Sequence, residues 1–277
     1  MTDEGYSLVD LDLAARLERT EAQGSANYVA ARGRQHPSSG ATWIEVAGAY
    51  AMFDGADSPL TQTFGLGMFG PISPEDLDRI EAFYEERDAP VFHEVSPLAD
   101  PSVLALLNAR RYHPIEFTNL LHRPIAARAA DAPRNPAVRV RLVRDDEEDV
   151  LLWARIAAEG WSDHGDVREL LADVARVNAE RDDTFAFLAE LDGNPIAAAS
   201  YFVHNGVAML AGASTVPDAR RQGAQLALLD ARLALAAEQG CDLAMMGAQP
   251  GSASQRNAER HAFRIAYTRI KWQSAID

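Results

Sequence analysis

Two arginines, a glycine and the start of a long helix stand together in the second half of the chain. Arg220 and Arg221 precede Gly223, and apolar residues then recur with the 3.6-residue period of a helix. The first turn of a helix has backbone N–H groups without helical partners and carries the positive end of the helix dipole. A glycine there lets an oxyanion approach the backbone closely, and arginines add positive charge. The pattern therefore predicts a phosphate-binding turn.

A strand is expected directly before this turn, over residues 207–215, and the helix after it is expected to end before Gly240. Two earlier strands, 184–191 and 196–204, are bounded by Asp-Gly and Asn-Gly turns, which are typical of hairpins. The remaining elements expected in this half are a strand over 138–142, helices from Asp145 or Asp146 to Gly160 and over 166–180, a strand over 242–247, a helix over 254–261 and a strand over 264–272.

The turn resembles motif A of the GNAT (Gcn5-related N-acetyltransferase) acyltransferases. That motif has Arg or Gln, then Gly, then Gly or Ala, after a strand that ends near Val-Pro. Arg220 and Gly223 match its first two fixed positions, and Val216-Pro217 precedes them. Gln225 stands where the family has Gly or Ala, so the match is incomplete. The element order predicted for the second half is also the family's order, whereas the alternative is an ordinary basic helix start in an unrelated α/β protein.

The resemblance implies that the chain uses acetyl-CoA (coenzyme A) as a co-substrate and needs no metal. The pyrophosphate would lie against the backbone of residues 221–226, and the pantetheine amides would pair with the extended backbone of 214–216. The sequence itself has one cysteine and seven histidines without a convincing metal-ligand spacing. The predicted cofactor-binding residues are Ser214, Thr215, Val216, Arg220, Arg221, Gln222, Gly223, Ala224, Gln225, Leu226 and Asn257.

Acetyl transfer to an amine needs a base for the ammonium and a proton for the leaving thiolate. The family's usual acid is a tyrosine at the position that Ala258 occupies here, so that acid is absent. Ser254 and Asn257 lie on the same segment and are the candidates for contact with the coenzyme sulfur. Serine and asparagine are equally typical of residues that cap a short helix.

Glu159 is the candidate general base, because it precedes Gly160-Trp161 in the helix region that borders acceptor sites in the family. Glu190 and His204, near strand ends, are alternatives. For each of the three, a surface charge or a hydrogen-bonded polar residue is the more common explanation, and a water chain could replace them.

The first half repeats the second weakly. Apolar positions and the order helix, strand, short helix, strand recur at nearly constant separation, which predicts a second, degenerate GNAT-like unit. Its counterpart of the phosphate turn, residues 67–76, contains Pro71 and Pro74, which donate no N–H, and Glu75 and Asp76, which repel phosphate. This copy is therefore predicted to have lost cofactor binding. The matched pairs are Leu77 and Leu226, Ile80 and Leu229, Tyr84 and Leu233, Phe92 and Leu243, and Tyr112 and Phe263.

The predicted fold class is α/β (α+β), with two tandem GNAT-like domains, each a mixed and mostly antiparallel sheet flanked by helices. The expected division is 1–125 for the degenerate domain, 126–136 for a linker and 137–277 for the acetyltransferase domain. Elements of the first half are expected as one or two helices within 8–32 with a break near Gly24-Ser25, strands at 42–46, 49–53 and 60–66, a helix from Ser73 or Pro74, a strand at 91–95, a helix at 102–110 and a strand at 114–121.

A net charge of −15 disfavours nucleic-acid partners. The absence of a signal-like start or a long apolar run favours a cytoplasmic protein without membrane association. The expected function is transfer of an acetyl group to a primary amine of a small molecule or an amino terminus by direct attack on the thioester. The alternative is a non-catalytic acyl-CoA-binding or regulatory protein. A nucleotide-binding α/β protein is disfavoured by the antiparallel hairpins. The acceptor, the acyl chain and homodimer formation stay open.

Overall fold

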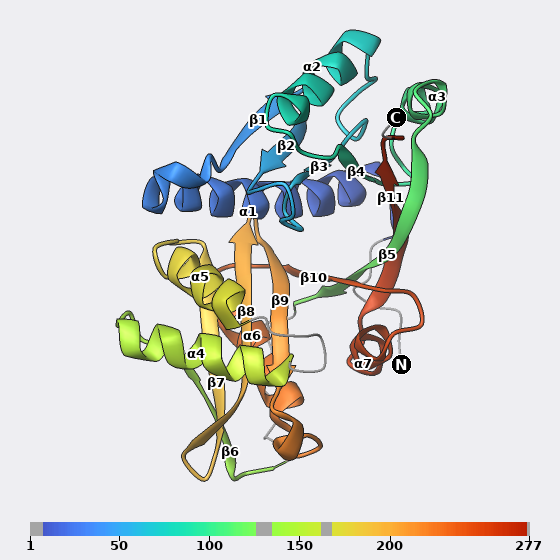
Figure 1. Cartoon of the computed structure of the whole chain (residues 1–277). Coiled ribbons are helices and arrows are strands. Elements are labelled where there is room, and N and C mark those ends of the chain that lie inside the picture. The colour runs from blue at the N-terminus through green and yellow to red at the C-terminus, as the bar shows by residue number, and fades with distance from the viewer. Residues whose placement is uncertain (1–7, 126–134, 162–167, 276–277) are drawn as a thin grey trace. The chain divides into compact units, whose positions relative to one another are not determined.

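The computed structural model describes residues 8–125, 135–161 and 168–275 (Figure 1). The chain forms two compact units, one of Met1–Pro124 with Met245–Asp277 and the other of Ile125–Ala244. Most of the predicted linker, 126–134, lies outside the described residues. Residues 245–277, expected to complete the second domain, group instead with the first unit, because their strand pairs with strands of the first half.

The sheet of the first unit has the strand order β1-β2-β3-β4-β11-β5. Strands β3 and β4 run parallel, whereas β11 is antiparallel to both β4 and β5. The C-terminal strand therefore completes a sheet whose other strands come from the first half. The strand bounds are Thr42–Val46 (β1), Ala49–Phe53 (β2), Gln62–Phe64 (β3), Phe92–Val95 (β4), His113–Pro124 (β5) and Arg264–Gln273 (β11).

Four helices accompany this sheet: α1 (Leu11–Gln35), α2 (Pro74–Glu85), α3 (Ser102–Ala109) and α7 (Ala253–Arg260). The break expected near Gly24-Ser25 does not occur, and α1 is continuous. Both residues are buried, so tertiary packing stabilises helical geometry where local propensity disfavours it. The stripe predicted on α2 is confirmed as core and comprises Leu77, Ile80 and Tyr84.

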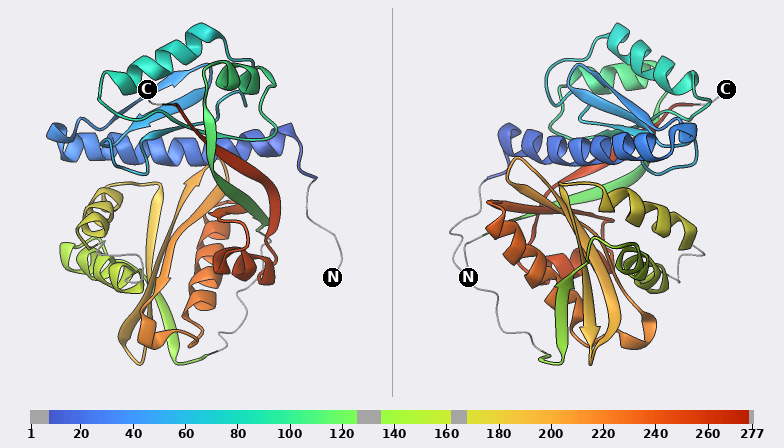
Figure 2. Two further views of the ribbon diagram at one scale, coloured as in Figure 1. Left: turned by 45° about the vertical axis from the view of Figure 1, so that its right-hand side comes forward. Right: turned by 90° about the vertical axis from the view of Figure 1, so that its left-hand side faces the viewer.

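The second unit contains the antiparallel strand order β9-β8-β7-β6. Helices α4 (Glu147–Gly160) and α5 (Arg168–Ala179) lie on one side of these strands, and α6 (Ala224–Glu238) lies on the other (Figure 2). The division between the units falls within β10 (Leu243–Ala248). The other strand bounds are Val138–Leu142 (β6), Thr184–Leu191 (β7), Asn194–His204 (β8) and Val207–Thr215 (β9), and short 3₁₀ turns occur at Pro37–Ser39 (η1) and Pro217–Ala219 (η3).

A bidentate ion pair ties β6 to the start of α4. Arg141 Nη1 and Nη2 donate to the two Asp149 carboxylate oxygens at 2.7 and 2.8 Å, and Arg141 Nε donates to Glu190 at 2.7 Å. The hydrogen bonds from Arg141 lower the pKa of Asp149 to about 2. Glu190, an alternative general base in the sequence, is thus engaged in positioning α4 against the sheet.

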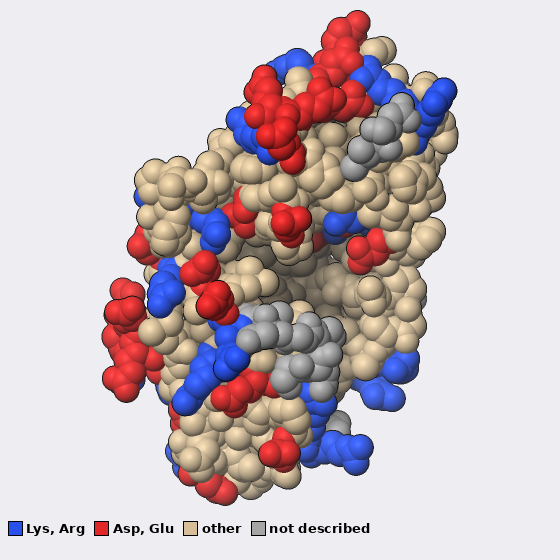
Figure 3. Space-filling view, viewed as in Figure 1, with Lys and Arg blue, Asp and Glu red and all other residues tan. Residues whose placement is uncertain are grey.

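Acidic side chains gather on the visible surface over α2, at the top of Figure 3. The acidic residues of α2 are Glu75, Asp76, Asp78, Glu81 and Glu85.

Within the described ranges, no helix has the length and apolar character needed to cross a membrane. The same residues place no group of three or more His, Cys, Asp or Glu side chains where they could hold a metal ion.

Candidate active site

Strand β9 carries an irregularity shortly before the predicted phosphate turn. Its pairing with β8 shifts between Ala198 and Ser200, so that two β9 residues, Gly212 and Ala213, oppose one residue of β8. Gly212 has a φ of 62°, in the left-handed region that glycine adopts without strain. An isolated glycine within a strand pattern is the sequence signal for such a bulge, which the prediction of a continuous strand over 207–215 missed. The bulge bends β9 where its exposed backbone approaches the turn.

The end of β9 keeps one backbone edge directed away from β8. Val216 N–H donates to Ile196 C=O at 2.9 Å, which directs that amide toward β8. Because successive residues of a strand point their amides to opposite sides, the Thr215 amide faces the other way. This edge fits the predicted pairing of pantetheine amides with the backbone of 214–216.

The turn before α6 combines two left-handed residues with an uncapped helix start. Arg221 has a φ of 68° and Gly223, the N-cap residue, has a φ of 90°. No side chain caps α6, whereas α1, α2, α4 and α7 each begin with a side chain that accepts from the first turn. The α6 start therefore lacks the side-chain acceptor that these four helices have.

The backbone N–H groups of Arg221 through Leu226 have no acceptor among the described residues. Arg221 and Gln222 are exposed, and Arg220 Nη2 lies 3.5 Å from the Gly160 carbonyl oxygen at the end of α4. Consecutive free amides at the positive end of a helix, next to arginines, are suited to a phosphate or pyrophosphate group. These residues thus fit the diphosphate of coenzyme A.

Gln225, the departure from motif A, turns its side chain back onto β9. Its Nε2 donates to Thr215 Oγ1 at 2.8 Å. The side chain is therefore held between the first turn of α6 and the end of β9. This contact positions two elements of the predicted cofactor site relative to each other, a role that the sequence pattern did not indicate.

The equivalent helix start in the first half is closed by its own side chains. Ser73 Oγ accepts from the Asp76 amide at 3.1 Å, and Asp76 Oδ2 accepts from the Ser73 amide at 3.1 Å, which forms a capping box. The Ile72 amide donates to Ser102 Oγ at 3.2 Å. Internal acceptors thus occupy amides that a phosphate would need, and the loss of cofactor binding by this copy stays a prediction.

Gly160, at the end of α4, lies in tight contact with β9. A Cβ atom on Gly160 would lie 2.5 Å from Ser214 Oγ and 2.9 Å from the Thr215 backbone nitrogen. Ser214 Oγ itself donates to the Ala157 carbonyl at 3.2 Å. The Ser214 side chain thus holds α4 on the strand, and its hydroxyl is engaged in this contact.

Replacing Gly160 by alanine should lower the free energy of unfolding by about 1–3 kcal/mol, because the backbone nitrogen of Thr215 cannot move out of the way without distorting β9. Urea denaturation of Gly160→Ala would measure this. The neighbouring exposed residue supplies the control, and Glu159→Ala should stay within about 0.5 kcal/mol of the wild type. Equal stability of the two variants would contradict the tight approach of α4 to β9.

Residues 122–252 match a family model described as an acetyltransferase (GNAT) domain. This segment therefore resembles a GNAT domain. The match covers β9, the phosphate turn and α6, and it ends before α7. A comparison with curated proteins found no match.

Solved structures share the fold of the chain beyond this GNAT domain. A GCN5-related N-acetyltransferase from Kribbella flavida has a TM-score of 0.69 and 20% identity, with 96% of each chain covered. A GCN5-related N-acetyltransferase from Sphaerobacter thermophilus has a TM-score of 0.58 and 14% identity, covering 82% of this chain and 76% of that one. A tandem GNAT protein from the clavulanic acid biosynthesis pathway has a TM-score of 0.58 and 15% identity, covering 82% and 78%. The chain therefore has a GNAT-type fold, with a tandem GNAT protein among its structural neighbours.

The structure brings part of the predicted site together in the second unit. The cofactor-binding residues from Ser214 to Leu226 form one continuous strand end and helix start. Glu159 is exposed on the last turn of α4, one residue before the carbonyl that Arg220 approaches. Ser254 and Asn257 are exposed on α7, which belongs to the other unit and lies beyond the matched GNAT segment. Their catalytic roles, and that of Asn257 in cofactor binding, stay predictions.

Proposed function

We propose that the chain transfers an acetyl group from acetyl-CoA to a primary amine of a small molecule or of an amino terminus. The observation that carries this proposal is the uncapped α6 start, with free amides from Arg221 to Leu226, inside a GNAT domain. At the start of α2, the Ser73 and Asp76 side chains accept from the helix amides instead. The second half of the chain would therefore bind the coenzyme, and the first half would serve as scaffold.

Each part of the site would have a distinct task. The α6 amides and the exposed Arg221 would hold the diphosphate, and the backbone edge at Thr215 that faces away from β8 would align the pantetheine arm. Bound acetyl-CoA supplies an activated thioester. Glu159 would accept the proton of the attacking ammonium and pass it to solvent, since its side chain is exposed. The negative surface of the protein would favour approach of a cationic acceptor.

The test combines coenzyme binding with turnover. Calorimetry should show saturable binding of acetyl-CoA, and thiol release from acetyl-CoA should depend on the added amine across a panel of small amines and peptides. Arg221→Gln should weaken coenzyme binding by about fivefold to tenfold, through loss of one charge-assisted contact. Arg139→Gln removes an equally exposed charge from β6 of the same unit and should leave the affinity unchanged.

A second function, a non-catalytic acyl-CoA-binding or regulatory protein, is favoured by one specific observation, the absence of the family's usual tyrosine at Ala258, which is buried. Tight coenzyme binding without amine-dependent thiol release would support this second function and would refute acetyl transfer to amines. Failure of acetyl-CoA to bind would exclude both.

A further inference from the structure

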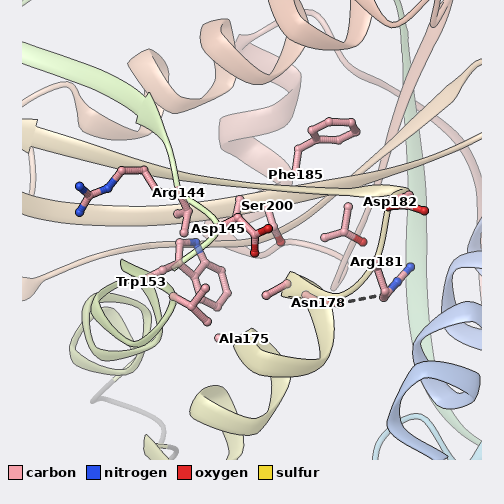
Figure 4. Close-up of a pocket in the computed structure, with 14 residues that line it drawn as sticks. Arg144, Asp145, Trp153, Ala175, Asn178, Arg181, Asp182, Phe185 and Ser200 are labelled. Carbon is pink, nitrogen blue, oxygen red and sulfur yellow. Dashed lines mark hydrogen bonds between the residues drawn. The ribbon is translucent and has the colours of Figure 1, made fainter. Parts of the chain in front are cut away.

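A cavity of about 300 Å³ lies inside the second unit, between α4 and α5 and the strands β7 and β8 (Figure 4). Its volume is at the lower end of the roughly 300–1,000 Å³ that is usual for ligand pockets. Trp153, Ala175 and Asn178 lie on the helix side of the strands, whereas the Phe185 ring points to the opposite side. None of the lining residues belongs to the segment 214–226, so the cavity is distinct from the phosphate turn.

The two arginines at the cavity are already engaged by acidic partners. Arg181 Nε and Nη2 donate to the Asp183 carboxylate, each at 2.9 Å, and Arg181 Nη1 donates to Asn178 at 3.0 Å. Arg144 Nε lies 3.4 Å from the Asp146 carboxylate. Their charges are thus balanced within the protein.

The negative charges of the two aspartates that line the cavity have no such partners among the described residues. Asp145 and Asp182 are exposed at its rim, and neither forms an ion pair or hydrogen bond with any described residue. The cap of α4 is the adjacent Asp146, so Asp145 has no role in starting that helix. The electrostatic field at the opening is therefore set by two unpaired carboxylates, which favour a cation.

An aromatic ring forms a rigid wall of the same cavity. Trp153 is 4% exposed, and its Nε1 donates to the Ala199 carbonyl of β8 at 3.1 Å, which fixes the orientation of the indole. Val150 and Ala175 add apolar surface beside it. An indole next to carboxylates is a combination that attracts organic cations with an apolar body.

We propose that this cavity binds a compact organic cation, an ammonium ion with an apolar body, attracted by Asp145 and Asp182 and covered by Trp153. The proposal does not depend on acetyl transfer. The Trp153 ring also lies close to the β9 bulge, since a Cβ on Gly212 would lie 3.9 Å from Trp153 Cζ2.

Benzyltrimethylammonium is a suitable probe, because it has the required chemistry and no N–H that could be acetylated. Calorimetry on the full chain should show saturable binding that weakens as salt is added, and benzyl alcohol, a neutral compound of similar shape, should bind more weakly. Asp145→Asn should lower the affinity by about fivefold. Asp192→Asn removes the same charge in the β7–β8 turn of this unit, at a φ of 51° that asparagine tolerates, and should leave the affinity unchanged.

Trp153 provides an independent readout. The chain has four tryptophans, so incorporation of 5-fluorotryptophan gives four ¹⁹F signals, and Trp153→Phe identifies the one that belongs to the cavity. That signal should shift on addition of benzyltrimethylammonium, with the same saturation as in calorimetry. Absence of saturable binding, equal affinities of Asp145→Asn and Asp192→Asn, or a shift confined to the other three signals would overturn the proposal.

Discussion

Replacing Arg269 by methionine should lower the free energy of unfolding by about 3–5 kcal/mol at pH 8. Arg269 is 2% exposed on β11, and its Nη1 and Nε lie 2.8 Å and 2.9 Å from the carboxylates of Glu21 and Glu94. Nη1 also donates to Glu18, which is fully buried, at 3.4 Å. Methionine fills a similar volume but leaves three carboxylates without their cation, which is far more costly than losing an exposed pair.

The loss should depend on pH in a direction set by Glu18. Burial raises the pKa of Glu18 to about 7, with Arg269 acting against this rise, and burial also raises the pKa of Glu94. The folded state therefore retains protons that the unfolded state releases above about pH 4.5, so stability should fall as pH rises from about 4.5 to 7. Without Arg269 both pKa values rise further. The destabilisation of Arg269→Met should thus be smaller at pH 5 than at pH 8.

Urea denaturation of Arg269→Met at pH 5 and pH 8 would measure both effects. Arg79→Met is the matched control, because Arg79 is 64% exposed in its side chain and lies 3.9 Å from Asp76 on the surface of α2. This control should change stability by no more than about 0.5–1 kcal/mol at either pH. Equal unfolding midpoints for the two variants at pH 8 would show that the buried cluster is not ionised as described.

Replacing Gly223 by glutamate should weaken acetyl-CoA binding by about a hundredfold or more, which corresponds to roughly 2.7 kcal/mol. A carboxylate at the N-cap of α6 would accept the free amides and repel the diphosphate that we propose they hold. Because the φ of Gly223 is 90°, any side chain also costs about 1–2 kcal/mol of conformational energy.

Gly193→Glu is the control for both the conformational cost and the added charge. Gly193 has a φ of 83° in the β7–β8 turn, and a Cβ there would meet no atom within 4 Å. This variant carries the same strain and charge away from α6, so it should lose similar stability and keep its affinity for acetyl-CoA. Calorimetry and thermal unfolding would be measured on both. Unchanged coenzyme affinity in Gly223→Glu would contradict the placement of the diphosphate at α6.

The sequence by itself predicted most elements of both halves and the segment that holds the candidate site. Period and turn signals are local, and the positions of β7, β9 and α6 agree with them because each element's own residues satisfy its backbone geometry. The sequence also predicted the starts of α2 and α6, at Ser73 with Asp76 and at Gly223, because a few neighbouring residues decide whether a helix start is capped.

Only the tertiary structure decided which distant segments share a sheet, a cluster or a cavity. Strand β11 pairs with β4 and β5, although its sequence spacing assigns it to the second half, because strand pairing depends on which edge is available and not on order along the chain. That pairing also brings Arg269 into contact with Glu18, although most of the sequence separates the two residues. The partner of Gln225 and the unpaired state of Asp145 likewise depend on contacts between elements, which no local pattern encodes.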